Sequence, residues 1–136
     1  LKAEGPSPYI SQLMKEVGHH FTVFNGRNGV ELIDNLRAGC AGTIPGVECC
    51  DVQAEIYDLW HAGDIAEATD RFRQVLPLLS FLMLTIDHLL CYGKRLAARR
   101  LQLGTVYDRG PALPPDAANL ATLDFWSNTL ASFPEN

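Results

Sequence analysis

The chain has 136 residues, of which 47% are hydrophobic and 20% are charged, a composition typical of a soluble globular domain and not of a disordered or fibrous chain. Its formal net charge of -5 argues against a phosphate-binding surface, so nucleic acid is not an expected partner. No apolar run reaches the roughly 18 to 20 residues that cross a bilayer, so no membrane segment is expected.

The first residues are interpreted as the end of a β-strand. Leu1-Lys2-Ala3 precedes a loop at Glu4-Gly5-Pro6. Ser7 and Pro8 then form a cap and first-turn pair for a helix that Gly18 ends. Because this end has neither an initiator methionine nor a basic and apolar leader, we expect the sequence to begin inside a longer protein.

Two β-type runs follow, Phe21-Thr22-Val23-Phe24 and Ala41-Gly42-Thr43-Ile44, with a helix between them. Asn28 is predicted to cap this helix with Glu31 three positions on, and Gly39 is predicted to end it. Strand, helix and strand in this order predict parallel strands joined by right-handed crossovers, as in a doubly wound sheet or a closed barrel.

The rest of the chain is predicted to be helical. A helix over residues 51–62 is expected to end at Gly63 in a left-handed conformation. The next helix begins with a capping box of Asp64 and Glu67. It is expected to kink or break at Pro77, because proline removes a hydrogen bond from a helix interior.

Two more helices are predicted near the C-terminus. The first covers residues 86–103 and is expected to end at Gly104. After a loop rich in glycine and proline, the second covers residues 116–131. The basic residues of the first helix are interpreted as a solvated or subunit-facing stripe, composed of Lys94, Arg95, Arg99 and Arg100.

The cysteines and histidines show no pattern of a metal site. Cys49 and Cys50 are adjacent, no C-x-x-C pair occurs, and no histidine stands at ligand spacing. His19 and His20 precede a strand and are expected on the surface away from any catalytic face. We therefore expect no metal, and we interpret the four cysteines as reduced thiols of a cytoplasmic protein.

Three strand and helix units do not close an eight-stranded barrel, because that fold typically needs about 250 residues. The residues alone leave three alternatives: a half-barrel fragment, a small open three-stranded α/β sheet, or one piece of a cleaved chain. The exposed edge of a three-stranded parallel sheet argues against a small independent domain.

Four segments in this order resemble the dihydrodipicolinate synthase and N-acetylneuraminate lyase family: Leu-Lys-Ala-Glu-Gly-Pro, Phe-Thr-Val-Phe-Asn-Gly-Arg-Asn-Gly, Ala-Gly-Cys-Ala-Gly-Thr-Ile-Pro-Gly and Tyr-Gly-Lys-Arg-Leu-Ala-Ala-Arg-Arg-Leu-Gln-Leu-Gly. The resemblance implies an α/β fold, the C-terminal part (strands 6–8) of a (β/α)8 TIM barrel with a C-terminal helical extension. It implies that residues 1–62 are the last βα units of the barrel and that residues 63–136 are a C-terminal helical region.

The resemblance assigns Lys2 as the lysine that forms an imine with a 2-keto acid. An amine with an ordinary pKa of about 10.4 is protonated at pH 7, so a nucleophilic lysine has to be desolvated or placed near positive charge. The implied protein is a class I lyase acting on pyruvate or a 2-keto-3-deoxy sugar acid, with no organic cofactor. The family's tyrosine and carboxylate-binding arginine lie on earlier strands, so this chain alone is expected to be inactive.

The same resemblance places the substrate pocket at the C-terminal ends of the strands. Its candidate lining residues are Glu4, Asn25, Gly26, Arg27 and Ile44. The Pro-Gly that follows Ile44 departs from the family's usual Val-Thr-Ala-Asn, which puts simple dihydrodipicolinate synthesis in doubt. A non-catalytic ligand-binding or regulatory module on the same scaffold is the alternative, and a homo-oligomer, either a tetramer or a dimer, is expected in both cases.

Overall fold

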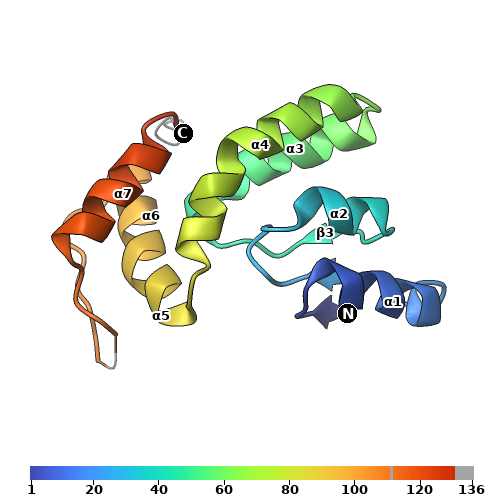
Figure 1. Ribbon diagram of the computed structural model, residues 1–136, viewed down its shortest axis with the longest axis horizontal. Coiled ribbons are helices and arrows are strands. Elements are labelled where there is room, and N and C mark those ends of the chain that lie inside the picture. Colours follow the sequence, from blue (N-terminus) through green and yellow to red (C-terminus); the bar gives the residue numbers. More distant parts are fainter. Residues whose placement is uncertain (111, 131–136) are drawn as a thin grey trace. The chain divides into compact units, whose positions relative to one another are not determined.

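A computed structural model describes residues 1–110 and 112–130 of the chain. The chain forms two compact units, Leu1–Leu76 and Pro77–Asn136, and each is described by itself (Figure 1). Residues beyond 130, which include the end of the helix predicted over 116–131 and of the region predicted over 63–136, lie outside the described residues.

The first unit contains a three-stranded parallel sheet. Its strands are β1 (Lys2–Ala3), β2 (Phe24–Asn25) and β3 (Gly42–Thr43), in the order β1-β2-β3. Lys2 pairs with Phe24, which in turn pairs with Gly42. The predicted parallel arrangement is therefore confirmed, and both β1 and β3 present a free edge among the residues that the structure describes.

The strand predicted over residues 21–24 begins only at Phe24. Phe21 is 57% exposed, and its backbone N–H donates to the carbonyl of Val17 at 3.0 Å, so it prolongs the turn that ends the preceding helix. Hydrophobic composition alone does not distinguish such a turn from a strand.

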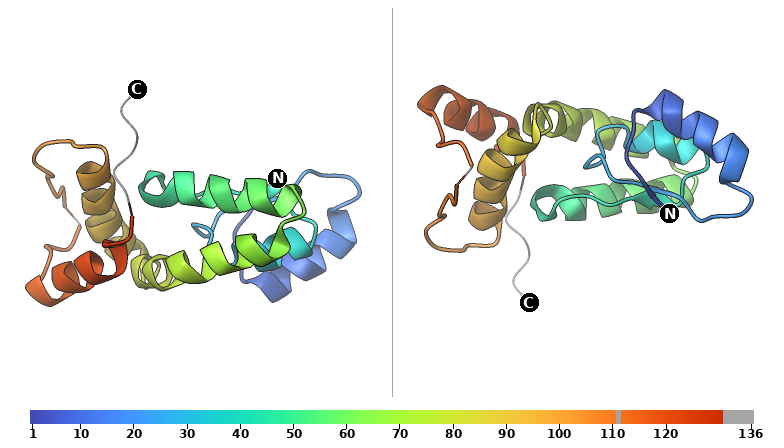
Figure 2. Two further views of the ribbon diagram at one scale, coloured as in Figure 1. Left: turned by 90° about the horizontal axis from the view of Figure 1, so that it is seen from above. Right: turned by 90° about the horizontal axis from the view of Figure 1, so that it is seen from below.

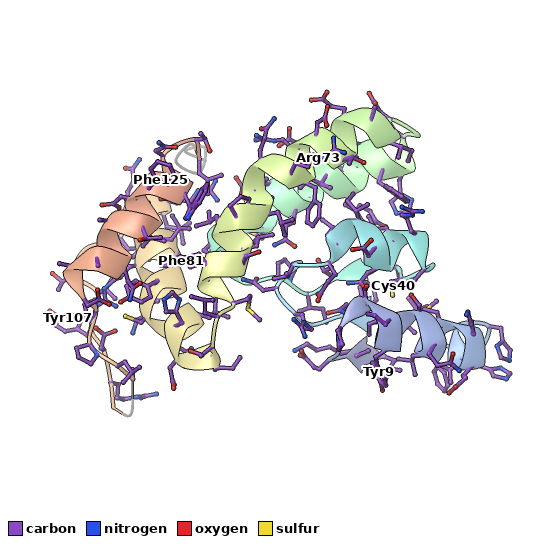
Figure 3. The ribbon with its side chains drawn as sticks, in the orientation of Figure 1. Tyr9, Cys40, Arg73, Phe81, Tyr107 and Phe125 are labelled. Atoms are coloured by element: carbon purple, nitrogen blue, oxygen red, sulfur yellow. The ribbon has the colours of Figure 1, made fainter. Side chains whose placement is uncertain are left out.

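Helix α1 (Ser7–Val17) covers the sheet through a small apolar core. Pro6, not Ser7, is its N-cap and no side chain caps it, which corrects the predicted Ser7 cap. The proline at the second helical position leaves no backbone donor there, so the helix start has one fewer group to satisfy. The buried core residues are Ala3, Ile10, Val23 and Cys40, the last of which is labelled in Figure 3.

Helix α2 (Leu32–Arg37) lies beside α1 and begins later than predicted. Asn28 does not cap it. Asn28 and Gly29 have φ of 52° and 77°, and the N–H of Val30 donates to the carbonyl of Arg27, which makes a tight turn. The predicted end is confirmed, because Gly39 has φ of 94° and closes the last helical turn.

Two longer helices follow β3. A 3-10 turn over Val47–Cys49 leads into α3 (Cys50–His61), and α4 (Ile65–Leu82) runs antiparallel to it (Figure 2). The left-handed stop at Gly63 is confirmed by its φ of 87°. Asp64 accepts a hydrogen bond from the N–H of Glu67 at 3.3 Å, as expected for a cap.

Pro77 does not break α4. The proline lies inside the helix, which continues as far as Leu82. Of the predicted kink or break, the break is therefore wrong, and one backbone hydrogen bond of this helix has no donor.

The second unit contains α5 (Ile86–His88), a π-helical turn over Leu89–Gly93, α6 (Lys94–Arg100) and α7 (Ala117–Ser127). The helix predicted to end at Gly104 ends earlier. Gln102 takes a left-handed φ of 54°, and the N–H of Leu103 donates to the carbonyl of Ala98 at 2.8 Å. A glutamine thus occupies the position that glycine usually fills.

The basic residues of α6 pair with groups of their own unit. Lys94 Nζ lies 3.1 Å from a carboxylate oxygen of Asp108 and donates to the carbonyl of Tyr107 at 2.7 Å. Arg95 forms a two-pronged ion pair with Asp108, and Arg99 lies 2.5 Å from Asp124 of α7. The loop between α6 and α7 is thereby attached to α6 at Asp108.

Asp108 is expected to keep its charge well into the acid range. The hydrogen bond from Arg95 lowers the pKa of Asp108 from 3.8 to about 2, with a smaller contribution from Lys94. Because the folded pKa is the lower one, the attachment is complete above pH 4 and is lost as the pH falls towards 2. An NMR titration of the Asp108 carboxyl carbon measures this midpoint.

The matched variants for this titration are Arg95→Gln and Lys94→Gln. Arg95→Gln should move the midpoint towards 3.8, and Lys94→Gln should move it less, because Arg95 contributes the larger effect. An unchanged midpoint in Arg95→Gln would contradict the assignment.

Three further observations apply to the part of the chain that the structure describes. No single helix is both long and apolar enough to span a bilayer, although one bent pair, Ile65–Leu82 with Ile86–Arg100, passes on length and composition alone. No group of three or more His, Cys, Asp or Glu side chains is arranged to hold a metal ion. The four cysteines form no disulfide with one another.

Candidate functional site

The C-terminal ends of the three strands meet at one edge of the sheet. Because the strands are parallel and in register, the loops that begin at Glu4, Gly26 and Ile44 all leave from this edge. In barrel enzymes the chemistry is performed at this end of the strands. The loops thus bring the sequence-predicted site residues to one region of the first unit.

Lys2 and Glu4 form an ion pair at this edge. The Nζ atom of Lys2 lies 2.7 Å from Oε1 of Glu4, and the two side chains are 50% and 57% exposed. The two opposite charges therefore lie in direct contact at the ends of the strands. At such exposure the pair contributes little to folding stability.

Gly26 leaves room for this ion pair. A β-carbon at position 26 would lie 2.2 Å from Oε1 of Glu4 and 2.4 Å from Cε of Lys2. The absence of a side chain at Gly26 therefore lets the Lys2 and Glu4 side chains cross the loop that follows β2. These three sequence-predicted residues are brought together by the fold.

Asn25 connects the loops that follow β1 and β2. Its side chain is 1% exposed, its amide donates to the carbonyl of Gly5 at 3.0 Å, and its Oδ1 accepts from the N–H of Arg27 at 2.7 Å. Both sides of the carboxamide are therefore used by loop backbone. This arrangement fixes the loop carrying Gly26 relative to the loop carrying Glu4.

Arg27 is paired with Glu31 at the start of α2. Its Nη2 lies 3.3 Å from Oε1 of Glu31. Burial raises the pKa of Glu31, while the Arg27 charge opposes that rise. Ile44 lies on the third loop with 44% of its surface exposed, and its N–H donates to the carbonyl of Asn25 at 2.8 Å.

Three buried polar residues of this region are not predicted by the sequence patterns. Asn28, Glu48 and Gln53 are each at most 4% exposed and are hydrogen-bonded to one another or to nearby backbone. The one local signal is the Asn-Gly pair at 28–29, which is common in tight turns. Their contacts span 20 to 25 positions in the sequence, and no local pattern predicts such pairs.

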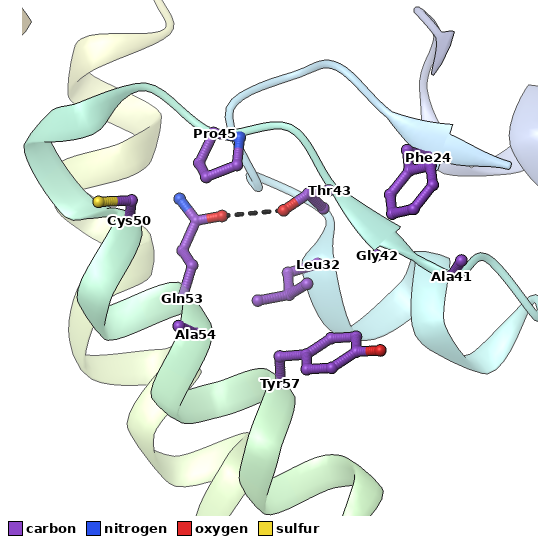
Figure 4. A pocket seen from close by; sticks show the side chains of 10 residues that line it. All are labelled: Phe24, Leu32, Ala41, Gly42, Thr43, Pro45, Cys50, Gln53, Ala54 and Tyr57. Carbon is purple, nitrogen blue, oxygen red and sulfur yellow. Dashed lines mark hydrogen bonds between the residues drawn. The ribbon is translucent and has the colours of Figure 1, made fainter. Parts of the chain in front are cut away.

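A separate pocket of about 360 Å³ lies between β3, α2 and α3 (Figure 4). Its lining is mostly apolar, and Gln53 accepts a hydrogen bond from the hydroxyl of Thr43 at 3.1 Å inside it. Lys2, Glu4 and Gly26 do not line it. The pocket includes residues of β3, which is an edge strand, so it adjoins a place where another strand can pair.

Comparisons of the sequence with protein-family models and with curated proteins found no match. Comparison of the structure with solved structures found several matches. A dihydrodipicolinate synthase from Rhodopseudomonas palustris matches with a TM-score of 0.78 and 19% identity, over 90% of this chain and 42% of that one. A 4-hydroxy-tetrahydrodipicolinate synthase from Methylacidiphilum fumariolicum SolV matches with a TM-score of 0.76 and 21% identity, over 91% of this chain and 41% of that one.

A third match is YagE from E. coli K12, a prophage protein of the dihydrodipicolinic acid synthase family in complex with pyruvate. Its TM-score is 0.78 at 21% identity, over 93% of this chain and 44% of that one. This chain therefore spans less than half the length of each of these proteins. The likeness confirms the family resemblance at the level of the fold: the chain is built like part of a dihydrodipicolinate synthase-type TIM barrel.

Proposed function

We propose that this chain belongs to a class I, imine-forming lyase of the dihydrodipicolinate synthase type, with Lys2 as the nucleophile. The observation that carries the proposal is the place of Lys2 in β1, at the C-terminal edge of a parallel sheet whose fold is like that of the dihydrodipicolinate synthases. A lysine at that edge is where a barrel enzyme needs its nucleophile, and the Glu4 carboxylate beside it holds the side chain in place there.

The remainder of the barrel is the first partner that this proposal requires. In it β1, β2 and β3 are strands 6–8, residues 1–62 are the last βα units and residues 63–136 form the C-terminal helical region. The free edges of β1 and β3 and the pocket beside β3 support this, because a closed barrel has no edges. Closure also desolvates Lys2, which is half-exposed in this chain.

In the proposed reaction, the Lys2 ammonium and the keto group of the substrate give a protonated imine and water, and the proton that the ammonium first releases is taken up again by the imine. Desolvation of Lys2 on barrel closure favours the neutral amine that attacks. The free amine attacks the keto carbon of the substrate, and loss of water gives a protonated imine. The protonated imine withdraws electrons from the adjacent carbon. A carbon–hydrogen or a carbon–carbon bond at that carbon then breaks, and its electron pair forms the enamine. No metal or organic cofactor takes part in these steps.

The substrate class is pyruvate or a 2-keto-3-deoxy sugar acid. The solved pyruvate complex of the prophage protein supports a 2-keto acid, and the Lys-x-Glu-x-Pro sequence at Lys2 favours a sugar acid. In this assignment Glu4 and Arg27 contact polar groups of the substrate, while Asn25, Gly26 and Ile44 shape the wall. A cytoplasmic homo-oligomer is part of the same proposal.

The test is borohydride reduction of the whole protein in the presence of pyruvate and, separately, of a 2-keto-3-deoxy sugar acid. Peptide mass spectrometry should find a covalent adduct on the peptide that carries Lys2. An unmodified Lys2 in a protein with a complete barrel would reject the lyase. That result would favour the alternative, a non-catalytic binding or regulatory module, to which the half-exposed and ion-paired state of Lys2 also corresponds.

A further inference from the structure

Asn28 is buried in the loop that follows β2. It is 3% exposed and has a left-handed φ of 52°, which non-glycine residues rarely adopt. Asparagine tolerates this conformation better than most residues. The tight turn of Arg27 to Val30 therefore directs the Asn28 side chain inward, not towards the helix that it was predicted to cap.

The carboxamide of Asn28 binds the loop that follows β3 at two points. Its Oδ1 accepts from the N–H of Gly46 at 2.5 Å, and its Nδ2 donates to Oε1 of Glu48 at 2.7 Å. The backbone carbonyl of Asn28 accepts from the side-chain amide of Gln53 at 3.0 Å. Asn28 thus connects the loop that follows β2, the loop that follows β3 and α3. The contacts of Asn28 with Gly46, Glu48 and Gln53 are called the Asn28 bridge.

The glycines around this bridge fit it closely. A β-carbon at Gly46 would lie 2.3 Å from Oε2 of Glu48, and one at Gly29 would lie 1.9 Å from Oε1 of Gln53. The backbone of the third loop therefore lies directly on the buried Glu48 carboxylate. A loop held this closely has a defined path where it leaves β3 at Ile44.

We propose that Asn28 and Glu48 are positioning residues, which hold the loops carrying Gly26 and Ile44 in one relative arrangement at the substrate-binding edge. The proposal rests on the proposed lyase function, whose binding wall those loops form. Neither residue is needed to build the sheet or to start α2, because β2 pairs through its own backbone and the N-cap of α2 is Glu31. The effect of the bridge is therefore expected at the loops.

The test variant is Asn28→Gly in the whole protein. Glycine accepts the left-handed φ without strain, so the change removes the carboxamide alone. The N–H of Gly46 should then exchange with solvent on the order of tenfold faster or more. In the borohydride assay the pyruvate concentration for half-maximal trapping should rise by on the order of tenfold, with a smaller change in the maximal rate.

A polarity swap distinguishes this bridge from general packing. Asn28→Asp places a carboxylate against Glu48, which should raise the half-saturating pyruvate concentration as much as Asn28→Gly or more. Adding Glu48→Gln restores a donor opposite the new carboxylate, because the glutamine amide at position 48 donates to the aspartate at position 28, which reverses the direction of the wild-type hydrogen bond. The double variant should recover both the Gly46 protection and the half-saturating concentration, and Glu48→Gln alone is the control.

Exchange of the Gly46 N–H tests the Asn28 bridge, and trapping of pyruvate by borohydride tests the proposed lyase, so the failure of one proposal can be distinguished from the failure of the other. Equal Gly46 exchange in the wild type and in Asn28→Gly would overturn the bridge, whatever the imine result. Faster exchange with unchanged half-saturation would overturn the positioning role. A wild-type protein that forms no imine, with a protected Gly46 that Asn28→Gly exposes, would reject the proposed lyase and leave the bridge between the loops established.

Discussion

Replacing Lys2 with arginine is expected to lower imine formation with pyruvate at least about a thousandfold, because the variant has no nucleophilic amine. Arginine keeps the positive charge opposite Glu4, and its guanidinium stays protonated in proteins. The sheet edge and the ion pair should therefore persist in Lys2→Arg. The adduct mass after borohydride reduction and the rate of substrate turnover are the measurements.

The matched control for this prediction is Lys15→Arg. Lys15 is an exposed lysine in the last turn of α1, away from the strand ends, and its replacement should leave trapping unchanged. If Lys2→Arg still gave an adduct on another lysine at the wild-type rate, the assignment of Lys2 would be wrong. If both variants lost trapping equally, the adduct would come from lysine amines in general and not from one site.

The order and type of the elements were predictable because their signals are local. Gly39 and Gly63 both stop helices as predicted, since a left-handed residue without a side chain is recognised from its own position and neighbours. The parallel sheet followed from strand, helix and strand in sequence. The fold class was therefore available before any contact was known.

The errors occurred where one local pattern fits two structures. Asn28 with Glu31 matches a helix cap, but the Asn-Gly pair that it begins is also a turn signal, and the turn is what forms. Pro77 and Gln102 are two residues that do not follow the usual behaviour of their type. Proline stays within α4 although it removes a hydrogen bond, and glutamine ends α6 although glycine stands two residues later.

The sequence offered candidate residues for the site but not the contacts between its loops. The resemblance placed Lys2, Glu4 and Gly26 at one end of the strands. The Lys2 and Glu4 ion pair joins residues two positions apart, whereas the fit of Gly26 against both side chains depends on the register that sets β1 beside β2. The Asn28 and Glu48 pair, 20 positions apart, depends on two loops that meet only in the folded chain. Tertiary contacts of this kind have no period in the sequence.

Replacing Gly26 with alanine is expected to slow imine trapping by roughly a hundredfold and to change the free energy of unfolding by less than about 1 kcal/mol. Gly26 is not among the glycines with positive φ, so alanine suits its backbone. Its methyl group would overlap the ends of the Lys2 and Glu4 side chains, which are flexible and half-exposed and can rotate away. The ion pair is then lost, and the amine is displaced from its position by about 1 Å or more.

Gly63→Ala provides the opposite case. A β-carbon at Gly63 meets nothing within 4 Å, but its φ of 87° is strained for alanine, so this variant should lose about 1 kcal/mol of stability. Its trapping rate should stay at the wild-type value, because Gly63 lies between α3 and α4, far in sequence from the strand ends. Trapping rates and urea unfolding of both variants measure the two effects. If Gly26→Ala instead lost stability and kept its trapping rate, Gly26 would be a turn residue only, and the space it leaves for Lys2 and Glu4 would have no part in the chemistry.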